Sequence, residues 1–184
     1  RKLAVQPVVR KAELLRGGCS EEEATQINGR SLMMLSKGIS SGFGCVLFPE
    51  GTSHDQSSML RFRTGPFRTV FAAAALAKAS NKPLPAVIPI GLHFREREKF
   101  RTDVWVEYGS PHKLSEEEIP LDLVQAVSQG KWVEPPAENV FALRDKVRTR
   151  LVPLTPNTST WEEYDALHLM GHVESRRTNQ PLIS

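Results

Sequence analysis

The sequence is poor in cysteine and has no long apolar run. Only Cys19 and Cys45 occur in 184 residues, which excludes a disulfide-stapled scaffold and favours structural thiols in a reducing compartment. No apolar stretch approaches the roughly 20 residues that a membrane-spanning helix needs. The chain opens on Arg1 and Lys2 without the apolar core of a signal peptide. We therefore expect neither a signal peptide nor an anchor within these residues.

Extremes of composition and charge are also absent. Hydrophobic residues make up 40% and charged residues 24%, close to the averages of soluble domains, which excludes a disordered or fibrous class. The chain has the length of one domain with a real core. Its net charge of +3 and pI near 9.0 suit anionic partners such as phosphates or acidic lipids, but equally a solvated surface with a slight Lys/Arg excess. We expect no nucleic-acid partner.

Apolar patterns bounded by turn residues predict strands separated by helices. Strands are predicted at residues 4–9, 42–48, 86–92 and 103–109. The last two are expected to form a hairpin across the charged loop from Arg95 to Arg101. The run at residues 42–48 ends at Pro49 and is typical of a buried strand with a loop at its carboxyl end. The alternation predicts an α/β fold with a mixed, mostly parallel central sheet and flanking helices.

Helix start signals complete the pattern. Ser20 with Glu23, and Ser159 with Glu162, have capping-box spacing. Helices are predicted from Ser20 to about Gly38, from Pro66 to Ala79, after Ser115, from Ala137 to Leu151 and from near Ser159. We expect residues 1–112 to belong to one domain and residues 113–184 to be a helical extension whose polar tail frays from Glu174.

A stretch rich in side-chain oxygens follows the run at residues 42–48. Glu50 and Gly51 open this stretch, and Arg61 and Arg63 lie close behind it. In α/β sheets, ligands bind outside the carboxyl ends of strands, where turn amides and nearby cations can meet a phosphate. A Pro-Glu-Gly turn is also a common way to reverse a chain. The pattern alone leaves a ligand site and a simple turn both open.

Three sequence blocks resemble those of a known family. Residues 48–52 (Phe-Pro-Glu-Gly-Thr) resemble the third signature block of the glycerolipid acyltransferases, which include the glycerol-3-phosphate and 1-acylglycerol-3-phosphate acyltransferases. Residues 8–10 (Val-Val-Arg) resemble the second block, and residues 86–92 the fourth. Residues 53–55 (Ser-His-Asp), followed by residues 63–65 (Arg-Thr-Gly), are similar to the branch of fungal glycerol-3-phosphate and dihydroxyacetone-phosphate acyltransferases.

This resemblance implies an activity and a site. The activity is transfer of a fatty acyl group from acyl-CoA or acyl carrier protein to a hydroxyl of glycerol 3-phosphate or a lysophospholipid, in phospholipid and glycerolipid synthesis. It implies a membrane surface at the cytoplasmic face, in the endoplasmic reticulum of a eukaryote or the inner membrane of a bacterium, and no metal or bound prosthetic group. Arg10 and Arg63 would hold the acceptor phosphate, with Arg61 as the substitute. The substrate-binding residues that the resemblance implies are Arg10, Glu50, Gly51, Thr52, Ser53, Arg61, Arg63 and Gly65.

The first block of the family, His-x4-Asp, does not occur in the chain. In the family this His is the general base that takes the proton of the attacking hydroxyl, and the Asp orients it. We therefore place the base upstream of residue 1 and interpret the chain as a fragment, truncated at its N-terminus and inactive alone. A noncatalytic phosphate- or lipid-binding relative is the alternative.

Three other patterns have simpler explanations. Residues 53–55 have the composition of a hydrolase triad, but neighbours in sequence rarely align their side chains for catalysis. His168 and His172 have the i, i+4 spacing of half a metal site and lack a third ligand nearby. The alternating charges of residues 95–99 fit a solvated loop, while contact with anionic headgroups is the sharper alternative.

Overall fold

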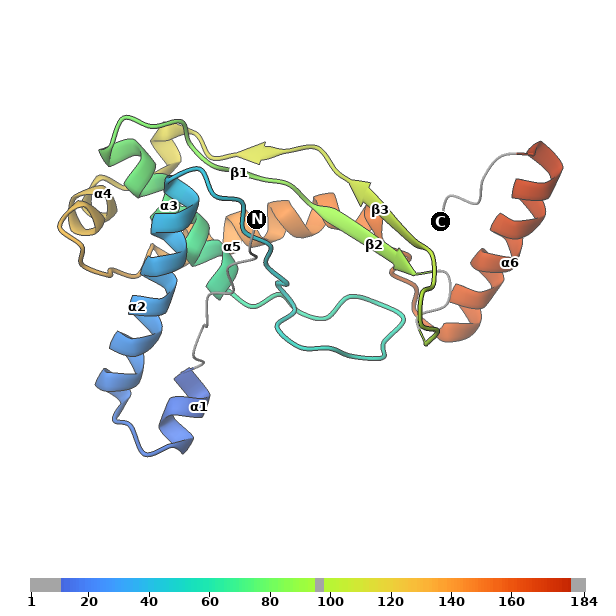
Figure 1. Ribbon diagram of the computed structural model, residues 1–184, viewed down its shortest axis with the longest axis horizontal. Coiled ribbons are helices and arrows are strands. Elements are labelled where there is room, and N and C mark those ends of the chain that lie inside the picture. The colour runs from blue at the N-terminus through green and yellow to red at the C-terminus, as the bar shows by residue number, and fades with distance from the viewer. Residues whose placement is uncertain (1–10, 95–97, 180–184) are drawn as a thin grey trace. The chain divides into compact units, whose positions relative to one another are not determined.

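A computed structural model gives the structure of the chain and describes residues 11–94 and 98–179 (Figure 1). The chain divides into two compact units whose segments interleave along the sequence. The first unit contains residues 11–49, Arg63–Val87 and His112–Arg144, and the second contains Glu50–Phe62, Ile88–Pro111 and residues from Asp145 onward. The boundary at residue 112 does not coincide with these units and stays a prediction. The predicted strand at residues 4–9 and Arg10 lie outside the described residues.

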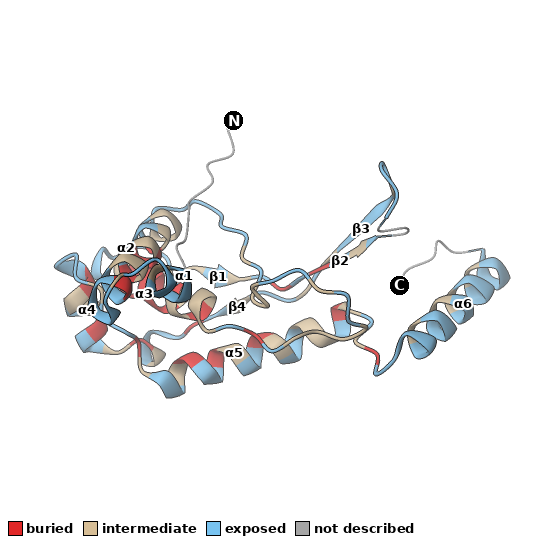
Figure 2. Cartoon of the chain, turned by 90° about the horizontal axis from the view of Figure 1, so that it is seen from below, coloured by how far each residue is buried: buried red, intermediate tan, exposed pale blue. Residues whose placement is uncertain are grey.

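The first unit is mainly helical. Its helices are α1 (Lys11–Arg16), α2 (Glu21–Ser40), α3 (Gly65–Ala79), the short 3-10 helix η1 (Glu116–Glu118), α4 (Leu121–Ser128) and the first half of α5 (Ala137–Leu151). The alanine-rich α3 packs against α2 and α4, and its small side chains let the helices approach closely. Buried residues gather on α2 and α3 (Figure 2). Ser36 of α2 is fully buried, and its hydroxyl donates to the carbonyl oxygen of Thr69 of α3 at 3.1 Å.

The helix starts confirm most of the sequence signals. The capping box of α2 is present, with the Ser20 N–H donating to Glu23 Oε2 at 2.9 Å and the Glu23 N–H donating to Ser20 Oγ at 3.3 Å. The Ser20 N–H and the Ser20 hydroxyl, which donates to the same Oε2 at 3.0 Å, together lower the pKa of Glu23. The box predicted at Ser159 is wrong by one residue, because Thr160 caps α6 (Trp161–Thr178) and Ser159 donates to Glu163 instead.

The last described helix extends further than expected. The tail was expected to fray from Glu174, but α6 continues to Thr178. The Glu174 carboxylate accepts two hydrogen bonds from the Arg177 guanidinium, at 2.6 and 2.7 Å. Within the described residues, no helix of the chain is long and apolar enough to cross a membrane.

The strands form two short antiparallel pairs. In the first unit β1 (Ala86–Val87) pairs with β4 (His112–Lys113), and in the second unit β2 (Ile90–Phe94) pairs with β3 (Val104–Tyr108). The second pair confirms the predicted hairpin. The single strand predicted at residues 86–92 is interrupted before Ile90, where Pro89 has no N–H to donate to a ladder. No described strands pair in parallel, and the mostly parallel central sheet stays a prediction.

Residues 43–48 do not form the predicted buried strand. Their large side chains are exposed to solvent: Phe43 is 72%, Val46 74% and Phe48 70% exposed. A strand needs the backbone groups of a neighbour to complete its hydrogen bonds. In the part of the chain that the structure describes, no strand pairs with this segment. The apolar run therefore remains outside any strand, with its large side chains exposed.

Candidate functional site

The candidate site is the loop of residues 50–62, which follows the exposed apolar run. The flanking Arg63 donates its backbone N–H to the carbonyl oxygen of Pro49 at 2.7 Å, so the two ends of the loop are tied together. Gly51 turns the chain with a φ of 72°, in the left-handed region where a side chain is strained. Glycine at this position lets the chain reverse directly after Glu50.

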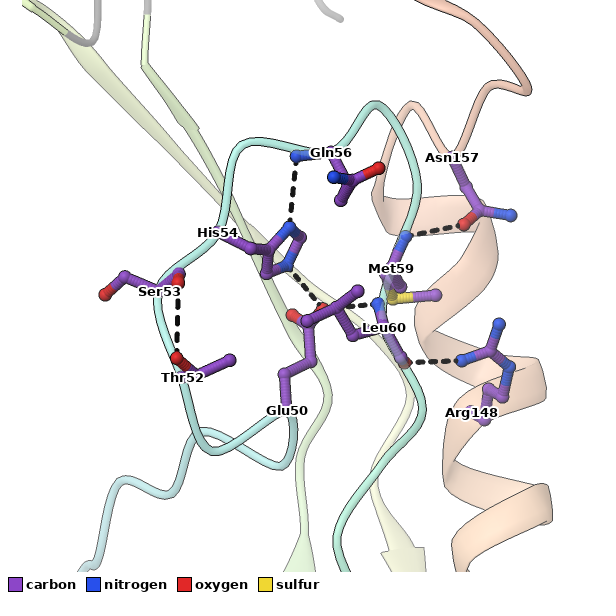
Figure 3. A network of polar contacts seen from close by, with 9 residues as sticks. All are labelled: Glu50, Thr52, Ser53, His54, Gln56, Met59, Leu60, Arg148 and Asn157. Atoms are coloured by element: carbon purple, nitrogen blue, oxygen red, sulfur yellow. Dashed lines mark hydrogen bonds and ion pairs between the residues drawn. The ribbon is translucent and has the colours of Figure 1, made fainter.

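The Glu50 carboxylate organises the inside of this loop (Figure 3). Its Oε2 atom accepts a hydrogen bond from His54 Nε2 at 2.7 Å and another from the Leu60 backbone N–H at 2.6 Å. The side chains of Glu50 and His54 are only 25% and 22% exposed. Because both bonds involve a charged acceptor, they are stronger than bonds between neutral groups. Among the described residues, the hydrogen bonds and the ion pair of this carboxylate all involve Oε2.

The hydrogen bonds of His54 define its tautomer. The backbone N–H of Gln56 donates to Nδ1 at 3.2 Å, so Nδ1 must be the unprotonated nitrogen. In the neutral ring the proton is then on Nε2 and is donated to Glu50. His54 thus connects the start of the loop to its middle, with one ring nitrogen accepting and the other donating.

A second set of contacts holds the far side of the loop. Arg148, near the end of α5, donates from Nη1 to the carbonyl oxygen of Leu60 at 3.0 Å. Its guanidinium also lies 5.4 Å from the centre of the buried Phe62 ring. Further along, the Met59 N–H donates to Asn157 Oδ1 at 3.0 Å. Ser57 and Thr158 exchange backbone and hydroxyl hydrogen bonds at 3.0–3.2 Å.

The loop itself contains five of the predicted site residues. Thr52 and Ser53 are exposed on it, and the Thr52 hydroxyl donates to the Ser53 carbonyl oxygen at 3.2 Å. Arg61 and Arg63 are also exposed. The second unit contains Glu50, Gly51, Thr52, Ser53 and Arg61, the first contains Arg63 and Gly65 (the first residue of α3), and Arg10 is outside the described residues.

The contacts of His54 bear on the triad composition of residues 53–55. Both ring nitrogens of His54 are engaged, by Glu50 and by Gln56, so His54 has no nitrogen left to form a triad with its sequence neighbours. The rings of His168 and His172 lie 6.3 Å apart on α6. Within the described ranges, no three His, Cys, Asp or Glu side chains form a group that could hold a metal ion.

Comparison with known proteins identifies relatives of the chain. It is 31% identical over 92% of its length to "Glycerol-3-phosphate O-acyltransferase 2" of Saccharomyces cerevisiae, and 28% identical over 70% of its length to "Glycerol-3-phosphate O-acyltransferase 1" of the same yeast. The chain spans only 21% and 15% of the lengths of these two relatives. No protein-family model and no solved structure matches it.

These similarities define the class of protein to which the chain belongs. The chain is related to the glycerolipid acyltransferases, as the blocks at residues 48–52 and 86–92 predicted. Within that class it is of the fungal type, the branch indicated by residues 53–55 and 63–65.

Proposed function

We propose that the protein containing this chain transfers a fatty acyl group from a thioester donor, acyl-CoA or acyl carrier protein, to a hydroxyl of glycerol 3-phosphate or a lysophospholipid. The relationship to the two yeast acyltransferases supports the reaction class. The observation that carries the proposal is the Glu50 carboxylate, anchored by two donors on Oε2 inside the loop that bears the Phe-Pro-Glu-Gly-Thr block.

This anchoring suits a carboxylate that binds an acceptor alcohol. Since Oε2 is occupied by His54 and Leu60, Oε1 is the oxygen that can accept a hydrogen bond from a hydroxyl of the acceptor. The acceptor hydroxyl oxygen then attacks the thioester carbonyl carbon, the carbon–sulfur bond breaks, and the thiolate leaves. A carboxylate held before the substrate arrives reduces the ordering needed at the moment of reaction.

The proton of the attacking hydroxyl needs a base other than His54. Nε2 of His54 already carries a proton that it donates to Glu50, and Nδ1 is occupied by the Gln56 N–H. Neither nitrogen can take a further proton without breaking one of these bonds. We assign this step to the His-x4-Asp pair of the family, which the chain does not contain.

The phosphate of the acceptor is assigned to arginine. The side chains of Arg61 and Arg63 are exposed, and both residues lie at the C-terminal end of the loop in sequence. A guanidinium binds phosphate with two parallel hydrogen bonds. Arg10 is assigned the same role from the resemblance alone.

A membrane surface completes the proposal. Between β2 and β3, Phe100 is 90% exposed and the Arg101 guanidinium lies 5.3 Å from its ring centre. An exposed aromatic ring beside a cation suits an interface between water and anionic lipid headgroups. Because the product is a lipid and the donor carries a long acyl chain, both also favour a membrane surface.

The test uses the full-length protein, labelled glycerol 3-phosphate and acyl-CoA or acyl carrier protein in lipid vesicles. We expect formation of lysophosphatidate. Glu50→Gln should lower kcat/KM by about 10- to 150-fold, the loss of a hydrogen bond to a charged group. The matched control is Glu22→Gln, at an exposed position of α2, which should retain wild-type kcat/KM. If the wild-type protein binds vesicles or phosphate but transfers no acyl group, the proposal of an enzyme is wrong and the noncatalytic binding protein takes its place.

A further inference from the structure

His54 holds the Glu50 carboxylate at a distance of 2.7 Å, and both residues belong to the second unit. We propose that His54 is the positioning residue of the acceptor site, which holds Glu50 so that its free oxygen faces the acceptor hydroxyl. This inference rests on the proposed function, because it assigns His54 a role in binding the same acceptor. His54 itself does not touch the reacting atoms.

The need for such a residue follows from the Glu50 side chain. Glutamate has several rotatable bonds, and ordering a long side chain costs about 1.5–2 kcal/mol in lost rotamer freedom. One donor on Oε2 would still allow the carboxylate to swing about that contact. Two donors from different places in the loop, the His54 ring and the Leu60 backbone, restrict the carboxylate to one orientation before a substrate arrives.

A hydrogen bond at its other ring nitrogen restricts the ring of His54 as well. The Gln56 N–H donates to Nδ1 at 3.2 Å, which fixes the tautomer with a proton on Nε2 and aims that proton at Glu50. An imidazole is the side chain that accepts at one nitrogen and donates at the other. The loop therefore uses histidine as a link between the backbone at Gln56 and the carboxylate of Glu50.

Two amide variants separate these two contacts. The amide nitrogen of glutamine lies as many bonds from the backbone as Nε2 of histidine, so His54→Gln can still donate to Glu50 while losing the contact with Gln56. The carbonyl oxygen of asparagine corresponds to Nδ1, so His54→Asn can still accept from Gln56 while losing Glu50. A positioning role requires the contact with Glu50, whereas a purely structural role in the loop requires the contact with Gln56.

The experiment measures steady-state kinetics of the full-length protein with both variants. We expect His54→Asn to raise the KM of the phosphorylated acceptor about tenfold or more, with the KM of the acyl donor nearly unchanged, as expected for a lost charge-assisted hydrogen bond. His54→Gln should recover a large part of this loss. His172→Asn, at an exposed position of α6, is the matched control and should leave both KM values unaltered. Equal losses in the two variants, better activity of His54→Asn, or no loss in either would overturn the proposal.

A second measurement does not depend on activity. In the chain labelled with nitrogen-15 in its histidine rings, two-bond correlation spectra should show His54 protonated at Nε2 alone, and Glu50→Gln should change this tautomer ratio. A ring protonated at Nδ1, or an even mixture, would overturn the inferred geometry. If the ring is protonated at Nε2 and the wild-type protein transfers no acyl group, the proposed function fails and the positioning role fails with it, while the contact stands as structural.

Discussion

Replacing Arg148 with methionine should loosen the loop of residues 50–62 without disturbing the helix that bears it. Methionine preserves the unbranched apolar stem and the helix propensity of arginine, but it removes the guanidinium. Two contacts disappear: the hydrogen bond from Nη1 to the Leu60 carbonyl oxygen, at 3.0 Å, and the stacking over Phe62, at 5.4 Å.

The size of the effect follows from these two contacts. A hydrogen bond from a charged donor contributes about 1.5–3 kcal/mol when well buried, and a partly exposed cation–π contact about 0.5–1 kcal/mol. These ranges add up to about 2–4 kcal/mol for buried contacts. Because Arg148 is only half-buried, solvent weakens both contacts, and we expect a total at or below the lower end of this sum, about 1–2 kcal/mol. The loop should then open about 5–30 times more often.

Amide hydrogen exchange detects this opening directly. The backbone N–H groups of Met59 and Leu60 are hydrogen-bonded to Asn157 and Glu50, and their exchange should accelerate by that factor in Arg148→Met. The amide of Ala73, inside α3 of the first unit, should exchange as in the wild type. Unchanged exchange at Met59 and Leu60 would refute the assignment of Arg148 as a support of the loop.

Four further substitutions test single features of the chain. Gly51→Ala should destabilise the loop by about 1–2 kcal/mol, because φ is 72° there; a urea midpoint equal to that of the wild type would contradict this. Gly29→Ala places a Cβ atom 2.6 Å from Cδ1 of Trp132 and should lower the free energy of unfolding by about 1–3 kcal/mol, whereas Gly38→Ala, in open space on the same helix, should stabilise the protein slightly in the same melts. Arg63→Ala in the full-length protein should raise the KM of the phosphorylated acceptor more than that of the acyl donor, and equal effects on both would remove Arg63 from the phosphate site.

The local structure of the chain could be predicted where short-range chemistry determines it. The capping box at Ser20, the helix with Pro66 in its first turn and the strands flanking residues 95–101 depend on neighbours within a few residues. The prediction of a buried strand at residues 42–48 is wrong, since burial of a strand depends on a partner strand and not on the run itself. Among the described strands no such partner is present.

The candidate site shows the same limit. Glu50 could be predicted as a site residue from the block at residues 48–52. Its partner His54 could not, because it belongs to residues 53–55, whose composition suggests a hydrolase triad. His54 lies one helical turn's spacing after Glu50, which is the only signal that could have suggested the pair. Arg148 and Asn157 lie 88 and 98 residues from their loop partners, and no spacing rule reaches that far.

The way in which distant residues hold the loop bears on how this protein can be dissected. A polypeptide ending at residue 112 would include every predicted site residue, yet it would lack Arg148, Asn157 and Thr158, which hold the backbone of residues 57–60. In such a shortened polypeptide the sequence motif would be intact while the loop that displays Glu50 had lost its scaffold. Minimal versions of this domain should therefore be cut after the segment that follows α5, and a motif-containing fragment that binds nothing would say little about the motif.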